Sequence, residues 1–271
     1  MSDPNRLTGS QESAKSNSSL DLRALTPARV ALASTGASIT TRHALEFSLA
    51  HAQARDAVHS TLAVPSLLAA LRERNLPAIH VRGAAANRAE YLRRPDLGRT
   101  LASVSAAQLA TNPGVPFTPS HRVSGIMGPT TLTIVLADGL SALATERHAL
   151  PVLDTLLPLL DATWQLTPIV IAEQSRVALA DEIGLALHAD ATVILIGERP
   201  GLSSPDSLGA YLTWSPRPGR KDAERNCISN IRAEGLDYAA AAARIAWTLG
   251  EARRLGLTGV SLRDSGVSLL P

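Results

Sequence analysis

The chain has 271 residues, of which 45% are hydrophobic and 18% are charged, and its formal net charge at pH 7 is +2. This balance provides ample apolar material for a core and excludes collagen, disulfide-rich scaffolds and a mainly disordered chain. The low net charge, without a stripe of Lys and Arg, argues against a nucleic-acid partner, and the single cysteine excludes an internal disulfide and indicates a reducing compartment.

The N-terminal segment is polar. Residues 1–20 are rich in Ser, Asn and Gln, so we expect a disordered leader, with a targeting role as the alternative. The segment lacks the apolar region of a secretory signal, and no apolar run in the chain reaches the roughly 18 residues that span a bilayer. We therefore expect a protein of the cytoplasm with no membrane segment.

Residues 21–110 are predicted to form a mainly helical N-terminal region. Phe47, Ala50, Ala54 and Ala57 recur at helical spacing and predict one apolar helix face. The elements expected here are a strand at 29–34, helices at 40–59, 65–74 and 95–110, and a short strand at 77–81. Residues 111–130 follow as a loop rich in Pro and Gly.

Residues 131–271 are predicted to form an α/β domain. Three short apolar runs, at 132–137, 168–172 and 192–196, are typical of strands buried on both faces. Helices are expected between them at 141–162, kinked or broken near Pro151, and at 176–188, and a last helix from Asp237 to Gly256. This alternation predicts a parallel, Rossmann-like sheet in a three-layer architecture.

Two strand ends are the candidate ligand sites, because parallel sheets bind ligands at the carboxyl ends of their strands. They are residues 138–141, with the sequence DGLS, and residues 197–204, with the sequence GERPGLSS. Glu198 and Arg199 either contact a polar ligand or only pair with each other across the loop. Cys227 is either a small buried apolar residue or a functional thiol.

The residues do not assemble a recognisable catalytic set. The motifs of serine hydrolases, zinc proteases, P-loop enzymes and dinucleotide-binding proteins are all missing. His43, His51 and His59 are each two helical turns apart, too far for one metal ion. We therefore expect no catalytic residue and no metal ligand in this chain, which suits a subunit that binds a cofactor while a partner supplies the chemistry.

From about residue 25 to the C-terminus, the chain resembles the light-chain family of ethanolamine ammonia-lyase. The resemblance is carried by segments in family order. They are HAQARDAV at 51–58, RPDLGR at 94–99, ADGLS at 137–141, GERPGLSSPDSLGAYL at 197–212 and ERNCISNIR at 224–232.

This resemblance implies an adenosylcobalamin-dependent enzyme that converts ethanolamine to acetaldehyde and ammonia by a radical mechanism. It implies a hetero-oligomer with a TIM-barrel large subunit that holds the substrate, in the cytoplasm or inside a bacterial microcompartment. In this chain the cobalamin contacts fall on Val177, Glu198 and Cys227, which makes residues 131–271 the cobalamin-binding domain. The alternatives are a structural partner that does not touch the cofactor and a stand-alone nucleotide-binding α/β protein.

Overall fold

The computed structural model describes residues 34–35, 38–111 and 129–262. The chain divides into two units, Met1–Glu46 and Phe47–Pro271. The expected leader, the strand at 29–34 apart from Ser34, and most of the loop at 111–130 lie outside the described residues.

The described part of the first unit is small. Strands β1 (Ser34–Thr35) and β2 (Ser38–Ile39) pair in antiparallel fashion. Helix α1 (Thr41–His59) begins in this unit and continues into the second, which confirms the helix expected at 40–59.

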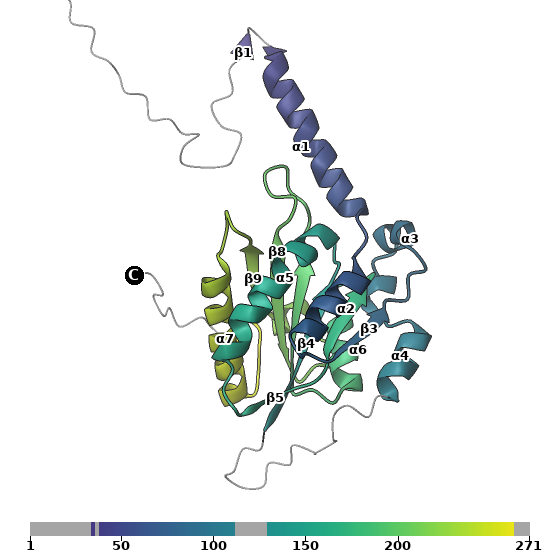
Figure 1. Ribbon diagram of the computed structural model, residues 1–271, viewed down its shortest axis with the longest axis vertical. Helices are drawn as coiled ribbons and strands as arrows, with labels where there is room; N and C mark the ends of the chain where they lie inside the picture. The colour runs from purple at the N-terminus through teal and green to yellow at the C-terminus, as the bar shows by residue number, and fades with distance from the viewer. Residues whose placement is uncertain (1–33, 36–37, 112–128, 263–271) are drawn as a thin grey trace, which may run out of the picture. The chain divides into compact units, whose positions relative to one another are not determined.

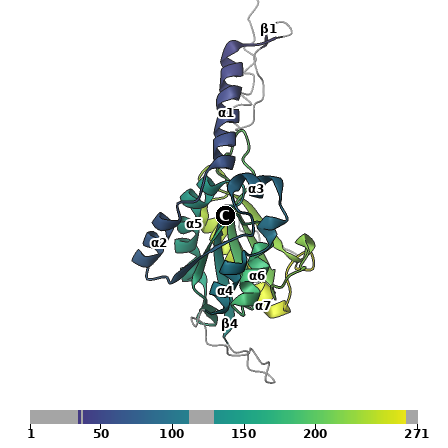
Figure 2. The same ribbon diagram turned by 90° about the vertical axis from the view of Figure 1, so that its right-hand side faces the viewer.

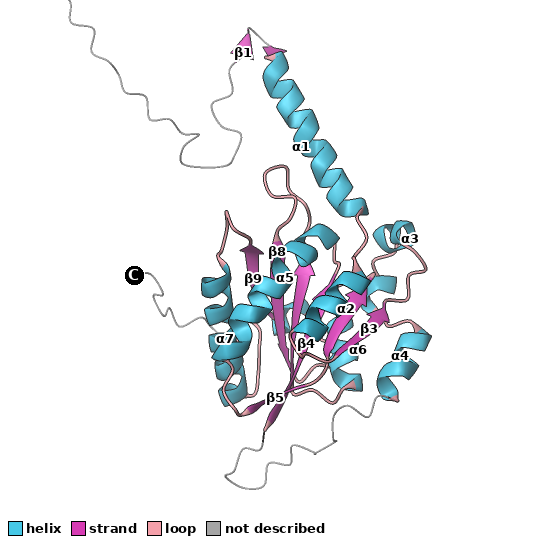
Figure 3. Cartoon of the chain, viewed as in Figure 1, coloured by secondary structure: helices cyan, strands magenta, loops and turns pink. Residues whose placement is uncertain are grey.

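The second unit is built on a seven-stranded mixed sheet, drawn as arrows in Figures 1 and 3. Its order is β3-β6-β4-β7-β8-β9, and β5 pairs with the start of β4. The pairs β3–β6, β6–β4, β4–β5 and β4–β7 are parallel, whereas β8 and β9 are added in antiparallel fashion. The strands are β3 (Ala78–Arg82), β4 (Thr130–Ala137), β5 (Trp164–Leu166), β6 (Ile169–Glu173), β7 (Ala191–Gly197), β8 (Leu208–Trp214) and β9 (Asn226–Ile231).

Helices cover both faces of this sheet, so the unit has three layers (Figure 2). Along β4, Ile134 and Leu136 point into one apolar core, and Val135 and Ala137 point into the other, as the alternation of a strand requires. The first core is closed by α2 (Val64–Glu73), α5 (Ala142–Leu156) and α7 (Tyr238–Leu255), and the second by α4 (Ser103–Ala110) and α6 (Leu179–Ala186).

Several predicted elements are confirmed. The three buried runs form β4, β6 and β7, and the short strand expected at 77–81 is β3. Helix α7 begins where expected, because the Asp237 side chain accepts a hydrogen bond from the N–H of Ala240 at 2.8 Å. It ends at Gly256, which adopts a left-handed conformation with φ of 68°.

The helix expected at 141–162 is shorter than predicted and is not broken at Pro151. Helix α5 continues through this proline to Leu156 because Val152 and Leu153 are fully buried, which offsets the missing hydrogen bond. A 3₁₀ turn at Leu157–Leu159 follows it.

The predicted helix at 95–110 begins only at Ser103. Asp96, near the start of that predicted helix, is paired with Arg94 at 2.6 Å. A 3₁₀ turn at Leu97–Arg99 and the short helix α3 (Arg88–Arg93) occupy the preceding residues. The helix expected at 176–188 is also shorter and forms α6.

Strands β8 and β9 were not predicted, so the sheet is mostly rather than wholly parallel. The domain boundaries drawn from the sequence stay a prediction. Strand β3, from the expected N-terminal region, nevertheless pairs with β6 of the expected C-terminal domain. Within the described residues, no helix is long and apolar enough to cross a bilayer.

Candidate functional site

The carboxyl ends of β4, β6 and β7 meet at one edge of the sheet. Helix α5 leaves β4 toward one face and α6 leaves β6 toward the other, so this edge is a topological switch point, where α/β folds bind ligands. The turns here need glycine. A Cβ atom on Gly139, whose φ is 53°, would lie 2.2 Å from the carbonyl oxygen of Gly197. A Cβ atom on Gly197 would lie 1.9 Å from that of Ser141. The two candidate strand ends are therefore brought together.

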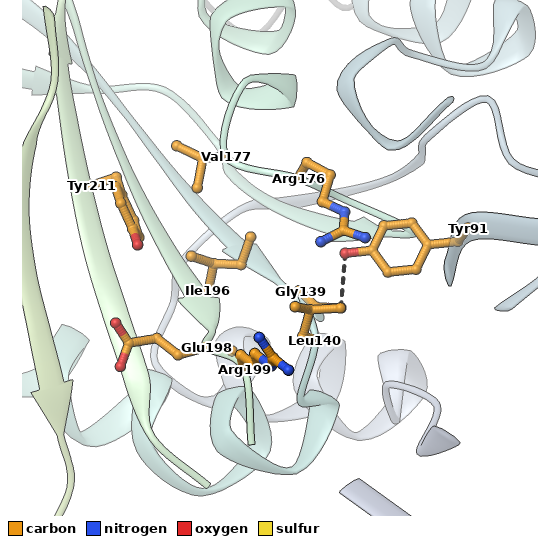
Figure 4. Close-up of a pocket in the computed structure, with 10 residues that line it drawn as sticks. Tyr91, Gly139, Leu140, Arg176, Val177, Ile196, Glu198, Arg199 and Tyr211 are labelled. Atoms are coloured by element: carbon orange, nitrogen blue, oxygen red, sulfur yellow. Dashed lines mark hydrogen bonds between the residues drawn. The ribbon is translucent and has the colours of Figure 1, made fainter. Parts of the chain in front are cut away.

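Two adjoining cavities lie along this edge. The first has a volume of about 480 Å³ and is shown in Figure 4. The second has a volume of about 740 Å³ and extends over α6 toward β9. Arg176, Val177 and Tyr211 line both cavities, so the two form one continuous surface.

Asp138 organises the turn behind the first cavity. Its carboxylate accepts hydrogen bonds from the backbone N–H groups of Gln174 at 2.9 Å and Ser175 at 3.0 Å. Arg88 donates to the same carboxylate at 3.1 Å and to the carbonyl oxygen of Gly139 at 2.8 Å. Burial raises the pKa of Asp138 to about 6, while the charge of Arg88 and the two N–H donors act to lower it. Asp138 thus ties the end of β4 to the end of β6.

Tyr91, from α3, joins the same two strand ends from the side. Its hydroxyl lies 2.9 Å from the carbonyl oxygen of Gly139 and 2.8 Å from that of Ser175. Burial is the main cause that raises the pKa of this phenol, so the hydroxyl remains a donor throughout the neutral range. Arg88 and Arg176 stack on the ring, with guanidinium carbons 4.9 Å and 4.5 Å from its centre.

Glu198 follows the end of β7, and only one of its two carboxylate oxygens accepts hydrogen bonds from the described residues. Its Oε2 accepts hydrogen bonds from the Ser207 hydroxyl at 2.5 Å and the backbone N–H of Asn230 at 3.2 Å. Gly209 leaves room for the other oxygen, since a Cβ atom there would lie 2.9 Å from Oε1. Among the described residues no hydrogen bond reaches Oε1, which leaves it available to a ligand.

Glu198 and Arg199 form no ion pair within the described part of the chain, and Figure 4 shows their side chains apart from each other. Arg199 is exposed at the rim of the first cavity. The reading in which these two residues only pair across the loop is therefore wrong.

Cys227, on β9, faces Tyr211 of β8 across the antiparallel ladder. The residue is exposed at the edge of the sheet and lines the second cavity. Partial burial of the sulfur raises the pKa of the thiol, against the hydrogen bond with Tyr211, which acts to lower it, and the charge of Glu198 adds to the increase. The thiol is therefore neutral at physiological pH.

The three residues expected to contact the cofactor do not share one cavity, but they share the continuous surface. Val177 lines both cavities from the turn before α6, Glu198 lines the first, and Cys227 lines the second. No group of acidic, His and Cys side chains within the described residues could hold a metal ion.

Sequence reasoning missed Tyr91, Arg176 and Tyr211 as lining residues. Tyr91 stands in a segment, EYL, that precedes the RPDLGR motif, and Arg176 directly precedes Val177. Their position in or beside segments that match the family was the only signal in the sequence. Only the fold shows that their side chains reach the cavities.

Comparison with known proteins shows one consistent family. The model of the ethanolamine ammonia-lyase light chain (EutC) family matches residues 16–263. Three similar proteins are named ethanolamine ammonia-lyase small subunit. The one from Pseudomonas paraeruginosa is 52% identical over 246 residues, covering 90% of this chain and 86% of the relative. That from Azotobacter vinelandii is 54% identical over 244 residues, covering 90% and 87%. That from Bradyrhizobium diazoefficiens is 51% identical over 254 residues, covering 93% and 92%.

Proposed function

The chain belongs to the ethanolamine ammonia-lyase light chain family, and from this membership we propose that it acts with a large subunit to convert ethanolamine to acetaldehyde and ammonia. Beyond family membership, the proposal rests on one observation, the continuous surface at the sheet edge. This surface is lined by Val177, Glu198 and Cys227. We propose that this surface binds adenosylcobalamin at the interface with the large subunit, a TIM barrel that holds the substrate.

The residues present fit this cofactor. Cobalamin combines an apolar ring with a rim of amide groups, and the surface combines apolar Val177, Leu140 and Ile196 with polar Glu198. The free Oε1 of Glu198, kept open by Gly209, is an acceptor suited to an amide N–H. The chemistry that adenosylcobalamin supplies when bound is radical initiation.

Each of the three residues has a distinct part in this proposal. Val177 excludes water from the cofactor face, which protects a reactive intermediate from side reactions. Glu198 fixes the orientation of the ring through Oε1 while Ser207 holds Oε2. Cys227, which lines the second cavity, would contact the cofactor as a neutral thiol, because burial raises its pKa. None of them transfers a proton in this proposal.

The partner accounts for the shape of the site. Both cavities lie at the surface of this chain, and Cys227 at their edge is exposed. A radical reaction needs a site closed to water, so a second protein has to cover the cofactor from the other side. We propose that the complex works in the cytoplasm or within a bacterial microcompartment.

Reconstitution tests the proposal directly. This chain is co-expressed with a large subunit, adenosylcobalamin and ethanolamine are added, and acetaldehyde is followed in a coupled assay. We expect activity that needs both chains and the cofactor. Failure of the two chains to form a complex would overturn the subunit role.

Variants separate the cofactor-binding role from a structural one. Glu198→Ala removes the amide acceptor and should weaken adenosylcobalamin binding by roughly tenfold, the effect of one hydrogen bond to a charged group. Cys227→Ala should have a smaller effect. The matched control is Glu251→Ala, which removes an equal charge on α7 from a surface pair with Arg254 outside both cavities. Unchanged affinity in both site variants would favour a structural partner that does not touch the cofactor.

A further inference from the structure

Arg176 is a half-buried cation for which the described residues provide no carboxylate partner. It lies in the turn between β6 and α6, lines both cavities, and stacks on Tyr91. Its Nε atom is buried and has no hydrogen-bond partner within the described residues. None of the ion pairs among those residues includes Arg176.

The other arginines at the cavities are either paired or exposed. Arg225 pairs with Asp181, and Arg220 with Glu224. Arg99 and Arg199 make no ion pair in the described part of the chain, but both are exposed, so water compensates their charge. Arg88, which stacks on the same Tyr91 ring, is paired with a buried aspartate. Arg176 alone among these arginines is both half-buried and unpaired.

A cation held partly out of water is costly unless an anion compensates it, and a guanidinium is well suited to the two oxygens of a phosphate. The rim of cobalamin carries neutral amides, and its anionic group is the phosphodiester of the nucleotide loop. We propose that Arg176 binds this phosphodiester, an inference that rests on the proposed cobalamin-binding function. Exposed Arg99 and Lys221, which line the second cavity, add to the positive potential there.

Three cofactor forms test the contact by the groups they contain. Adenosylcobalamin has the whole nucleotide loop, adenosylcobinamide phosphate has the phosphate without the ribose and base, and adenosylcobinamide lacks all three. Dissociation constants are measured by calorimetry and visible absorbance on the complex with the large subunit. The variants are Arg176→Gln, Arg176→Lys, and Arg72→Gln as a control, since Arg72 is an exposed cation on α2 outside both cavities.

We expect Arg176→Gln to weaken the two phosphate-containing forms by roughly ten- to a hundredfold, the range of a hydrogen bond to a charged group. Adenosylcobinamide affinity should stay within about twofold of the wild-type value, since a contact worth less than 0.5 kcal/mol changes binding by about that much. Arg176→Lys, which keeps the charge, should recover part of the loss, and the control should bind all three forms as the wild type does. Millimolar inorganic phosphate should compete with adenosylcobinamide phosphate in the wild type and lose this effect in Arg176→Gln.

Other outcomes would overturn the assignment. Equal weakening of all three forms would place Arg176 against the ring or in the folding of the turn. Weakening of adenosylcobalamin alone would indicate a contact with the ribose or base. No change in any form would mean that a carboxylate of the large subunit compensates Arg176. Failure of the wild-type complex to bind adenosylcobalamin would instead overturn the proposed function itself.

Discussion

Replacing Tyr91 by Phe removes one hydroxyl from the centre of the candidate site and leaves the ring in place. The side chain is fully buried, and its hydroxyl lies within hydrogen-bond distance of the carbonyl oxygens of Gly139 and Ser175. The stacking of Arg88 and Arg176 on the ring is retained in phenylalanine, and no cavity larger than the hydroxyl is created. Tyr91→Phe therefore isolates the link between the ends of β4 and β6.

The magnitude follows from counting donors. One hydroxyl has one proton, so the two short distances represent one shared hydrogen bond and not two. Gly139 keeps a donor in Arg88 at 2.8 Å, whereas no other donor within the described residues reaches the carbonyl oxygen of Ser175. The loss is that of one hydrogen bond with an acceptor left buried, about 2 kcal/mol. For a domain of this size the melting temperature should fall by roughly 4–8 °C.

Urea denaturation of the full chain, followed by far-UV circular dichroism, measures the change in the free energy of unfolding. Tyr91→Leu serves as the graded comparison, since it also removes the ring on which both arginines stack, and it should cost about 2 kcal/mol more. A Tyr91→Phe variant with an unfolding free energy within about 0.5 kcal/mol of the wild-type value would refute the assignment of Tyr91 as a link, because that is the scatter of neutral surface substitutions.

Three further changes test other parts of the site. Gly197→Ala puts a Cβ atom 1.9 Å from the carbonyl oxygen of Ser141, so we expect loss of soluble protein on expression; normal yield and melting temperature would contradict this. Ser207→Ala frees Glu198 and should weaken adenosylcobalamin binding by roughly 3- to 10-fold in calorimetry, with recovery in Ser207→Thr and an unchanged melting temperature. Burial lowers the pKa of His148 below its ordinary 6.5, so protonation favours the unfolded chain and stability falls as the pH drops below 6.5. The contribution of His148 is measured as the difference between the wild type and His148→Gln in urea titrations from pH 7 to 5, because the raised pKa of Asp138 gives the opposite slope in both proteins. This difference should shrink as the pH falls from 7 to 5.

The elements that the sequence predicts well are those whose residues agree locally with their final environment. The apolar runs of β4, β6 and β7 are buried on both faces, so their composition alone identifies them. Helix α7 has both its start and stop signals in Asp237 and Gly256. In such cases the local pattern and the tertiary structure demand the same residues.

The missed elements are those where tertiary context decides. Strand β9 has mixed exposure and polar residues, Asn226 and Asn230 among them, so its apolar pattern is weak. Its place follows from pairing with β8, which no local signal encodes. Helix α5 shows the converse. Pro151 normally breaks a helix, but buried residues before and after it in the chain pack into the core and keep the helix continuous. The pairing of β9 with β8 also places Cys227 in the lining of the second cavity and the N–H of Asn230 against Glu198.

The polar groups of the site that lack partners indicate the chemistry of the ligand more specifically than the residues that line the cavities. Most charges around the sheet edge are matched internally, such as Asp138 with Arg88 and Asp181 with Arg225. Among the described residues that line the first cavity, two half-buried charged groups depart from that pattern. No hydrogen bond reaches Oε1 of Glu198, and Arg176 has no carboxylate partner and a buried Nε atom without a hydrogen bond. A ligand that binds both groups must present a neutral N–H donor to Glu198 in the first cavity. It must also present an anionic oxygen to Arg176, where the first and second cavities meet. A simple nucleotide offers the anion together with a flat base, but it does not extend over a surface that continues to Cys227. A large ring with amide arms and one phosphodiester meets each of these demands, which is why the unmatched groups favour cobalamin over the nucleotide-binding alternative.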